Sequence, residues 1–323
     1  MGRGAELQGS SLHQLEIDLC EAVADLTAVV PLLGLLRVAT FGGLLIGGVW
    51  LFWSTANPWQ AIGSVTVAGI AYALLLITTH EAVHGTLLGR PRLEFAFSCL
   101  ISWPMAWPFA TYASLHRLHH RWNGRDERDP ERVEPLREEI EQAGPLRRWH
   151  QRHPFWLRAL LLGGVGLIID TVHKGVVLRG CDPRLPARLR LDLAGVILAQ
   201  LAMLGVAIAH GVVLRYVLFW LVVERIIGAI VQTRGLIEHH GLWNPSPGHR
   251  LTQLRSSRSV GAGIWLNACL GGLPNHAAHH AFPAIPFQRL PEASVRLMAV
   301  LELHGLEPLP RFRHYGEGIL QLL

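Results

Sequence analysis

The sequence carries little charge for its length. Acidic and basic side chains make up 16% of the 323 residues, while half of the residues are hydrophobic. A soluble domain usually has about 25% charged residues, so the shortage predicts an integral membrane protein. Lysine is almost absent, with Lys174 as the single example, and the formal charge of +5 comes from arginine. In a membrane protein such a balance indicates cytoplasmic loops and no nucleic-acid partner.

Cysteine is also scarce, and its spacing excludes several kinds of site. The four cysteines are far apart and form no C-x-x-C pair, which argues against a disulfide framework and a thiolate metal site. The chain has no flavin fingerprint, iron–sulfur cysteine pattern or haem-attachment motif. Electrons for any redox reaction are therefore expected from a separate protein.

Long apolar runs, in contrast, are abundant. A bilayer span takes about 20 mostly apolar residues, and four runs satisfy this, at about 35–54, 59–80, 192–210 and 212–234. Short turns, "STANP" and "HG", separate the members of each pair, so the runs predict two helical hairpins.

Two weaker runs are not expected to cross. Pro104 and Pro108 interrupt the run over 95–112, and charged residues surround the run over 155–169, which reads as an interfacial helix. Glu224 and Arg225, within the fourth apolar run, are expected to pair with each other or to flank the functional site.

Charge placement predicts the orientation. The turn over 54–58 has no basic residue and the second turn has only Arg215 nearby, so the opposite face should be cytoplasmic. The expected fold is an all-α integral membrane protein with a single domain, 1–323. Its four spans would hold a cytoplasmic helical cap, built from 80–190 and 234–323, with both termini on that side of a bacterial inner membrane or its equivalent.

Histidine is plentiful, with 18 residues, and eight of them form three clusters. The first is H-x-x-x-H, and "LHRLHH" and "NHAAHH" both give H-x-x-H-H. Positions i, i+3 and i+4 of a helix share a face, so each cluster is expected to aim its imidazoles at one point. The eight residues are His80, His84, His116, His119, His120, His276, His279 and His280.

These imidazoles predict a two-metal site. Burying so many without metal would require many hydrogen-bond partners, and eight are too many for one ion. Imidazole suits zinc, copper, iron and nickel, but a structural zinc site takes four ligands and is often rich in thiolate. A two-iron site with nitrogen ligands fits, and the four-span arrangement puts all three clusters on one face.

The first cluster also permits a different hypothesis. His80, Glu81 and His84 form H-E-x-x-H, the pattern of a zinc protease with a glutamate base. An intramembrane protease of this type would leave six clustered histidines unexplained, and the chain has no Asp-Gly pair for the second motif.

From about His80 to Pro291 the chain resembles the membrane fatty acid desaturase superfamily. "NHAAHHAFPAIPFQRLP" is similar to the signature around the third histidine box, and "RDERDP" to an Asp-Pro after the second. The resemblance implies a di-iron centre on these eight histidines, O2 as co-substrate and no catalytic residue apart from the metal centre. It adds a ligand after the fourth span, where we expect His239 rather than His240.

One position departs from the superfamily pattern. Many members have glutamate in the third box, where this chain has Ala278. Another side chain must then orient a metal-binding imidazole. The candidates are Glu81, Asp126, Asp129, Glu238 and Asn275.

The resemblance implies an oxygen-dependent oxidoreductase acting on a long apolar substrate that enters from the bilayer. Desaturation of a long-chain acyl lipid is the first expectation, and hydroxylation or ketolation of a carotenoid or similar molecule is the alternative. A ferredoxin or small cytochrome would supply electrons at the arginine-rich cytoplasmic face.

Overall fold

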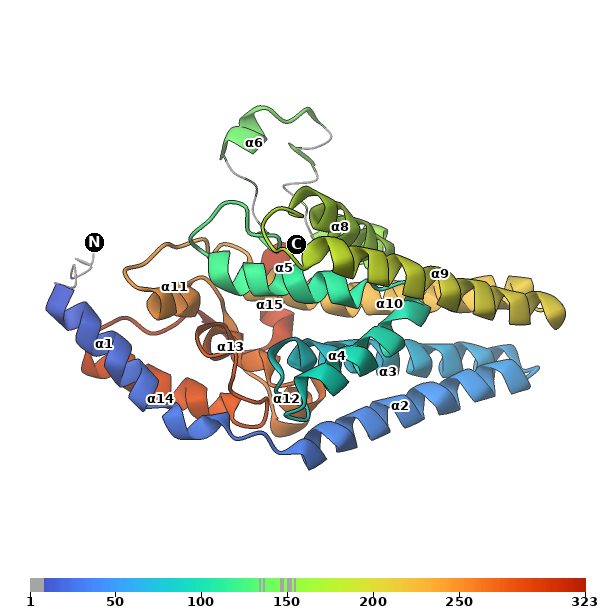
Figure 1. The fold of residues 1–323 in the computed structure, drawn as a ribbon, viewed down its shortest axis with the longest axis horizontal. Helices are drawn as coiled ribbons and strands as arrows, with labels where there is room; N and C mark the ends of the chain where they lie inside the picture. Colours follow the sequence, from blue (N-terminus) through green and yellow to red (C-terminus); the bar gives the residue numbers. More distant parts are fainter. Residues whose placement is uncertain (1–8, 134, 136, 146–147, 150–152, 154) are drawn as a thin grey trace.

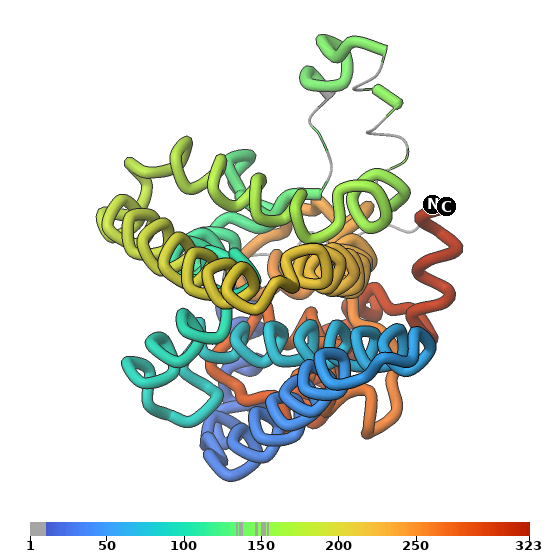
Figure 2. Tube along the Cα trace, turned by 90° about the vertical axis from the view of Figure 1, so that its right-hand side faces the viewer, coloured from blue at the N-terminus to red at the C-terminus, as the bar shows by residue number. Residues whose placement is uncertain are grey.

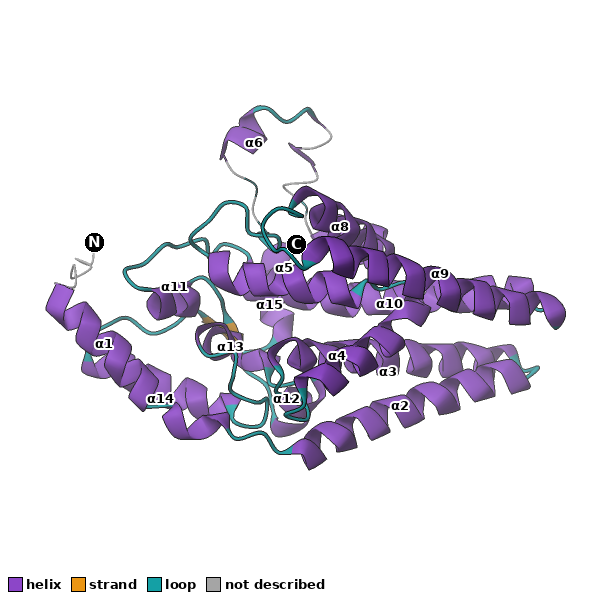
Figure 3. Cartoon of the chain, viewed as in Figure 1, coloured by secondary structure: helices purple, strands orange, loops and turns teal. Residues whose placement is uncertain are grey.

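The computed structural model is predominantly helical (Figure 3) and describes residues 9–133, 135, 137–145, 148–149, 153 and 155–323. The long helices extend along the longest axis of the molecule in Figure 1. They are α2 (Pro31–Ser54), α3 (Pro58–His84), α9 (Leu185–Ala209) and α10 (Val213–His239). The predicted helical class is therefore confirmed, and a long helix covers each of the four predicted runs.

The ends of α3 show why these helices begin and end where they do. The side chain of Asn57 accepts hydrogen bonds from the backbone N–H groups of Trp59 and Gln60, and Pro58 occupies the first turn. Directly after His84, Gly85 has a φ of 72°, the left-handed conformation that closes a helix. The helix therefore ends at the residue that closes the first histidine box.

Small residues allow the long helices to approach closely. A Cβ at Gly48 of α2 would lie 2.9 Å from the backbone oxygen of Ser64 in α3, so these two helices touch through backbone, as membrane helices often do. Helix α10 packs more extensively on α3 than on its sequence neighbour α9. The helices of the predicted second hairpin, α9 and α10, therefore pack against each other less than α2 and α3 do.

The run over 155–169, which was expected not to cross, is longer than predicted and is long and apolar enough to cross a membrane. Among the described residues, four helical segments are long and apolar enough to cross a membrane: α2, α3, α9 and the continuous segment Phe155–Val177. That segment comprises the π-helix η3 (Phe155–Leu162) and α8 (Gly163–Val177). It is foreshortened in Figure 1 and extends across the width of Figure 2, so it lies crosswise to the longest axis.

Two charged residues join α10 to that crosswise segment. Arg225 pairs with Glu224, which is the first of the two arrangements expected from the sequence. Arg225 also donates to the backbone oxygens of Leu161 at 2.5 Å and Leu162 at 2.7 Å in η3. Glu224 Oε2 accepts from the backbone N–H of Gly164 at 3.1 Å. The pair thus satisfies backbone groups at the junction between η3 and α8, and α10, which carries it, is not one of the four apolar candidates.

The proline-interrupted run is broken as predicted. It forms α4 (Pro91–Ser102), the short 3-10 helix η2 (Trp103–Met105) and α5 (Phe109–Trp122). Between η2 and α5, Ala106 has a φ of 58°. The break turns the chain so that α5 brings the second histidine box against the end of α3.

The remaining elements gather at one end of the long helices (Figure 1). They are α1 (Gly9–Glu21), η1 (Ala24–Thr27), α6 (Arg137–Glu141), α11 (His249–Arg255), α12 (Ile264–Cys269), η4 (Leu273–Asn275), α13 (His276–Ala281), α14 (Leu290–Leu303), α15 (Tyr315–Leu322) and two short parallel strands, β1 (Ser259–Val260) and β2 (Arg311–Phe312). Buried leucines of α1, α11 and α14, including Leu15, Leu251 and Leu297, form an apolar cluster with Ala278 of α13. This cluster supports the third histidine box from behind.

Candidate metal centre

The three predicted boxes and His239 meet where four helices converge. The first box occupies the last turn of α3, the second lies on α5, and the third lies on α13. His239 is the last residue of α10. The structure places the nine predicted imidazoles in two adjacent groups, while His240 is only half-buried and belongs to neither.

The first group, called here the five-histidine cluster, draws on all three boxes. Within it the candidate ligand atoms lie within 4.8 Å of one another. His116 Nε2 is 2.9 Å from His80 Nε2 and 3.0 Å from His120 Nε2. His84 Nε2 and His279 Nε2 are buried without a hydrogen-bond partner among the described residues. The members are His80, His84, His116, His120 and His279.

The second group, called here the four-histidine cluster, draws on α5, α10 and α13. His119, His239 and His280 have candidate ligand atoms within 4.8 Å of one another. His276 joins them, because its Nε2 is 2.9 Å from His239 Nε2 and 3.0 Å from His280 Nε2. His119 Nε2 is buried and unpartnered within the described part of the chain.

Each H-x-x-H-H box divides between the two clusters, which corrects the expectation that a box aims at one point. His116 and His120 enter the five-histidine cluster, while His119 enters the other. On a helix, residues i+3 and i+4 point about 100° apart, so they diverge on either side of residue i. The spacing therefore lets one helix direct its imidazoles into both clusters.

Carboxylates fix two of the imidazoles of α5. His119 Nδ1 is 2.8 Å from Asp129 Oδ1, and His116 Nδ1 is 2.7 Å from Glu131 Oε1. A carboxylate on Nδ1 sets the tautomer in which Nε2 has a free lone pair, the usual arrangement behind a metal-binding histidine. Both carboxylates come from the loop after α5, so this loop orients the second box.

Other partners hold the four-histidine cluster. His280 Nδ1 is 3.1 Å from Gln253 Oε1, and His239 Nδ1 is 3.3 Å from the backbone oxygen of Ser256. His276 Nδ1 lies 3.4 Å from Glu238 Oε2 but makes no hydrogen bond within the described part of the chain. Every imidazole of this cluster therefore has a polar group opposite its outer nitrogen.

The five predicted orienting side chains have different surroundings. Asp129 and Glu238 lie against imidazoles of the four-histidine cluster. The three others have different partners: Glu81 pairs with Arg37, Asp126 pairs with Arg128, and Asn275 donates to Asn267.

Three orienting groups were missed from the sequence: Glu131, Gln253 and the carbonyl of Ser256. Glu131 stands two residues after Asp129, and its place beside the Asp-Pro motif could have suggested it. Gln253 and Ser256 lie in a stretch with no recognisable motif. Ala278 packs into the apolar cluster behind α13. This chain therefore has an apolar contact at the position where many members of the superfamily have a glutamate.

The electrostatics suit metal binding. Burial lowers the pKa of His120, His276, His279 and His280 well below the usual value, so these imidazoles are neutral. Burial also lowers the pKa of His119, but nearby carboxylates, above all Asp129, outweigh this effect and raise the pKa overall. Neutral imidazoles, with buried Nε2 atoms that lack partners, fit a pair of transition-metal ions.

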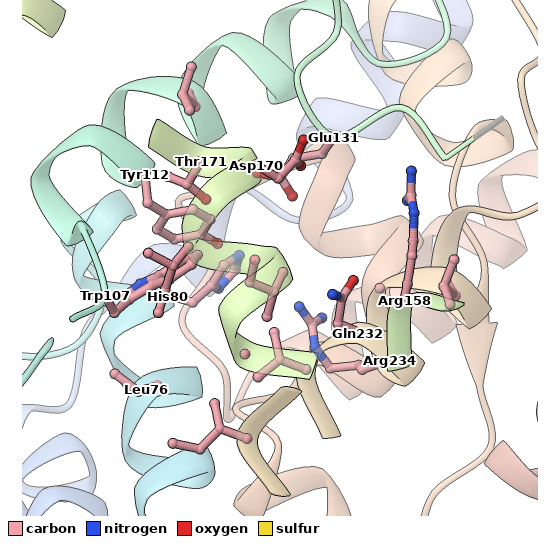
Figure 4. A pocket seen from close by; sticks show the side chains of 18 of the residues that line it. Leu76, His80, Trp107, Tyr112, Glu131, Arg158, Asp170, Thr171, Gln232 and Arg234 are labelled. Atoms are coloured by element: carbon pink, nitrogen blue, oxygen red, sulfur yellow. The ribbon is translucent and has the colours of Figure 1, made fainter. Parts of the chain in front are cut away.

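A cavity of about 170 Å³ adjoins both clusters (Figure 4). His80 of the five-histidine cluster and His239 of the four-histidine cluster line its wall. Charged side chains, among them Glu131, Asp170, Lys174 and Arg234, also contribute to the lining. Apolar side chains from α3, η2, α8 and α10 line much of the rest, including Leu76, Met105, Leu167, Ile168, Ile227 and Val231. Such a lining would bind an apolar molecule next to the imidazoles.

The environment of Glu81 excludes the protease hypothesis. A protease glutamate must face the metal-bound water, but Glu81 forms a buried ion pair with Arg37. His80 and His84 are two of five clustered imidazoles, so H-E-x-x-H is one part of a larger site.

Comparison with known proteins agrees with this geometry. The sequence profile described as fatty acid desaturase matches residues 56–311. The chain is similar to a beta-carotene ketolase of Paracoccus sp. (strain N81106 / MBIC 01143), 26% identical over 284 residues, covering 84% of this chain and 95% of the relative. It is also similar to a beta-carotene ketolase of Paracoccus sp. (strain PC1), 27% identical over 257 residues, covering 75% and 83% of the two chains.

Proposed function

The chain belongs to the fatty acid desaturase family and is an oxygen-dependent oxidoreductase; from this premise we propose that it oxidises a carotenoid, or a similar long terpenoid, to a ketone. The two ketolases support this choice, since the match extends over most of each chain. Desaturation of an acyl lipid, the first expectation from the sequence, becomes the second candidate and is supported by the name of the family profile.

The observation that carries the proposal is the placement of nine imidazoles around two positions beside an apolar cavity. Two iron ions bound there would supply activation of O2 and oxidation of an unactivated C–H bond. The histidines would bind the metals, and the side chains around them fix the orientation of the imidazole rings. Their roles as ligands are part of the proposal.

The cavity determines what the site can accept. His80 and His239 in its wall place the substrate carbon beside both clusters, while Trp107, Leu115 and Leu273 contribute apolar surface. A long hydrocarbon would gain free energy from burying its surface there. The substrate is therefore proposed to enter from the bilayer with its reacting end first.

Electron supply and topology complete the proposal. Because the chain carries no flavin or iron–sulfur motif, we assign electron delivery to a ferredoxin or small cytochrome. Exposed arginines beside the second box, Arg121, Arg125 and Arg128, offer a basic docking face for an acidic donor. On the proposed topology one domain, 1–323, lies in a bacterial inner membrane or its equivalent, with the site and both termini cytoplasmic.

Product analysis in whole cells tests the function. The full chain would be expressed with a ferredoxin system in a bacterial host that makes beta-carotene, alongside His119→Ala, and pigments and fatty acids would be profiled by mass spectrometry. We expect a keto-carotenoid in the wild type only. New acyl double bonds with unchanged pigments would support the second candidate, and no new product of either kind would contradict both.

A further inference from the structure

Tyr112 is the aromatic residue that connects the second box to the cavity. It lies one helical turn before His116 on α5 and lines the cavity together with His80 and His239 (Figure 4). Its ring stacks on His116, with centroids 5.2 Å apart, and packs on Trp107 at 5.3 Å. These contacts fix the ring beside the reacting end of the proposed substrate.

The hydroxyl of Tyr112 differs from those of the other three tyrosines. Tyr72 donates to the backbone oxygen of Ile101 at 2.5 Å, Tyr216 donates to Gln200 at 3.1 Å, and Tyr315 donates to Glu238 at 3.4 Å.

Within the residues that the structure describes, no hydrogen bond is found for the Tyr112 hydroxyl, and the residue is half-buried. In the wall of the cavity this hydroxyl is available to a ligand.

The proposed reaction creates a partner for this hydroxyl. Converting a CH2 group to a ketone takes two oxidations at one carbon. In the first, CH2, O2, two electrons from the donor and two protons give CHOH and water. In the second, CHOH, O2, two electrons and two protons give a geminal diol and water, and the diol loses water to form the C=O group. Between the two oxidations, the substrate carries one new polar group in a cavity that apolar side chains line in large part.

On the basis of the proposed ketolase function, we propose that the Tyr112 hydroxyl hydrogen-bonds the alcohol oxygen and retains the half-oxidised molecule for the second oxidation. Several other polar residues of the lining already have partners: Glu131 holds His116, Arg234 pairs with Glu238, and Lys174 pairs with Asp170. Gln232, another polar residue in the lining, already donates to the backbone oxygen of Gly163 at 3.1 Å. Tyr112 is therefore a specificity-determining residue that favours the ketone over the alcohol as final product.

The test is the ratio of alcohol to ketone made by Tyr112→Phe in the beta-carotene host. Phenylalanine keeps the stack on His116 and loses only the hydroxyl. We expect the ratio to rise about five- to tenfold, the effect of one neutral hydrogen bond, with iron per chain equal to the wild type. With purified alcohol as substrate, KM should rise by a similar factor.

Tyr216→Phe is the matched control, because it removes a hydroxyl that bonds Gln200 outside the cavity. Its product ratio should equal that of the wild type. An unchanged ratio in Tyr112→Phe, or a change accompanied by loss of iron, overturns the role of Tyr112 and leaves the ketolase proposal intact. A wild type that makes no ketone overturns the ketolase proposal, and the Tyr112 proposal with it.

Discussion

The two imidazole clusters stand side by side but are held in different ways. In the four-histidine cluster, three outer nitrogens have hydrogen-bond acceptors, and the fourth faces Glu238. In the five-histidine cluster, within the described chain, only His116 has such a partner, Glu131. Single polar groups from α10, α11 and the loops that follow α5 and α11 face the outer nitrogens of the four-histidine cluster. The order of the five-histidine cluster must then come from its helices.

A buried ion pair provides that order. Glu81 lies between His80 and His84 in the last part of α3, and it pairs with Arg37 of α2. The Arg37 guanidinium also lies 4.6 Å from the ring of Phe287, just beyond the third box. Arg37 therefore ties α2, α3 and the segment after α13 together. The comparison teaches that neighbouring metal positions can depend on different parts of a fold, one on helix packing and one on single polar groups.

The largest expected effects come from removing a ligand from either cluster. His84→Ala and His119→Ala should each lower turnover by more than about 100-fold, beyond the effect of losing a supporting partner. Iron per chain should fall from about two toward about one, as expected for a two-metal site. Metal analysis of purified protein measures this. Two irons and full activity in either variant would remove that histidine from the ligand set.

The next effect concerns the packing that orders the five-histidine cluster. Arg37→Met leaves the Glu81 carboxylate buried without its partner, which should destabilise the protein by about 3–5 kcal/mol. Unfolding in detergent, followed by circular dichroism, would measure the change.

The double variant Arg37→Met with Glu81→Gln should recover part of the loss, since it leaves no isolated charge. Equal stability of Arg37→Met and the wild type would contradict the role assigned to the ion pair.

A smaller effect is expected where a polar group orients one imidazole. Asp129→Asn cannot offer a carboxylate to His119, and iron affinity or activity should fall about 10–100-fold. Asp126→Asn is a matched control three residues earlier, because Asp126 pairs with the exposed Arg128 instead. Iron titration compares the two, and equal losses would show that the loop, and not the contact with His119, matters.

The smallest effect tests the choice between adjacent histidines. His240 is half-buried and belongs to neither cluster, so His240→Ala should change activity less than about twofold, as usual for a substitution away from a buried network. His239→Ala should behave like a ligand variant, since His239 Nε2 is 2.9 Å from His276 Nε2. A reversed order of the two variants would assign the ligand to His240.

The sequence allowed most of the site to be predicted, because periodicity and box spacing are local. The helical boxes and the break at Pro104 follow from helix geometry and proline chemistry, whereas the choice of His239 came from the resemblance to the desaturase superfamily. Gln253 could not be found in the same way, since its function depends on the packing of α11 against α13. The full length of the segment ending at Val177 was missed because charged residues at its end were taken as its boundary. Two of them, Asp170 and Lys174, pair with each other in the fold.

The length of α3 has a consequence for depth in the membrane. From Pro58 to His80 the helix rises about 33 Å, slightly more than the roughly 30 Å of hydrocarbon in a bilayer. On the proposed topology the first box therefore stands at the boundary of the hydrocarbon layer. The carbon that is oxidised would be one that can reach this depth near the headgroups. The depth of the site in the bilayer would therefore favour the end of a long molecule over its middle.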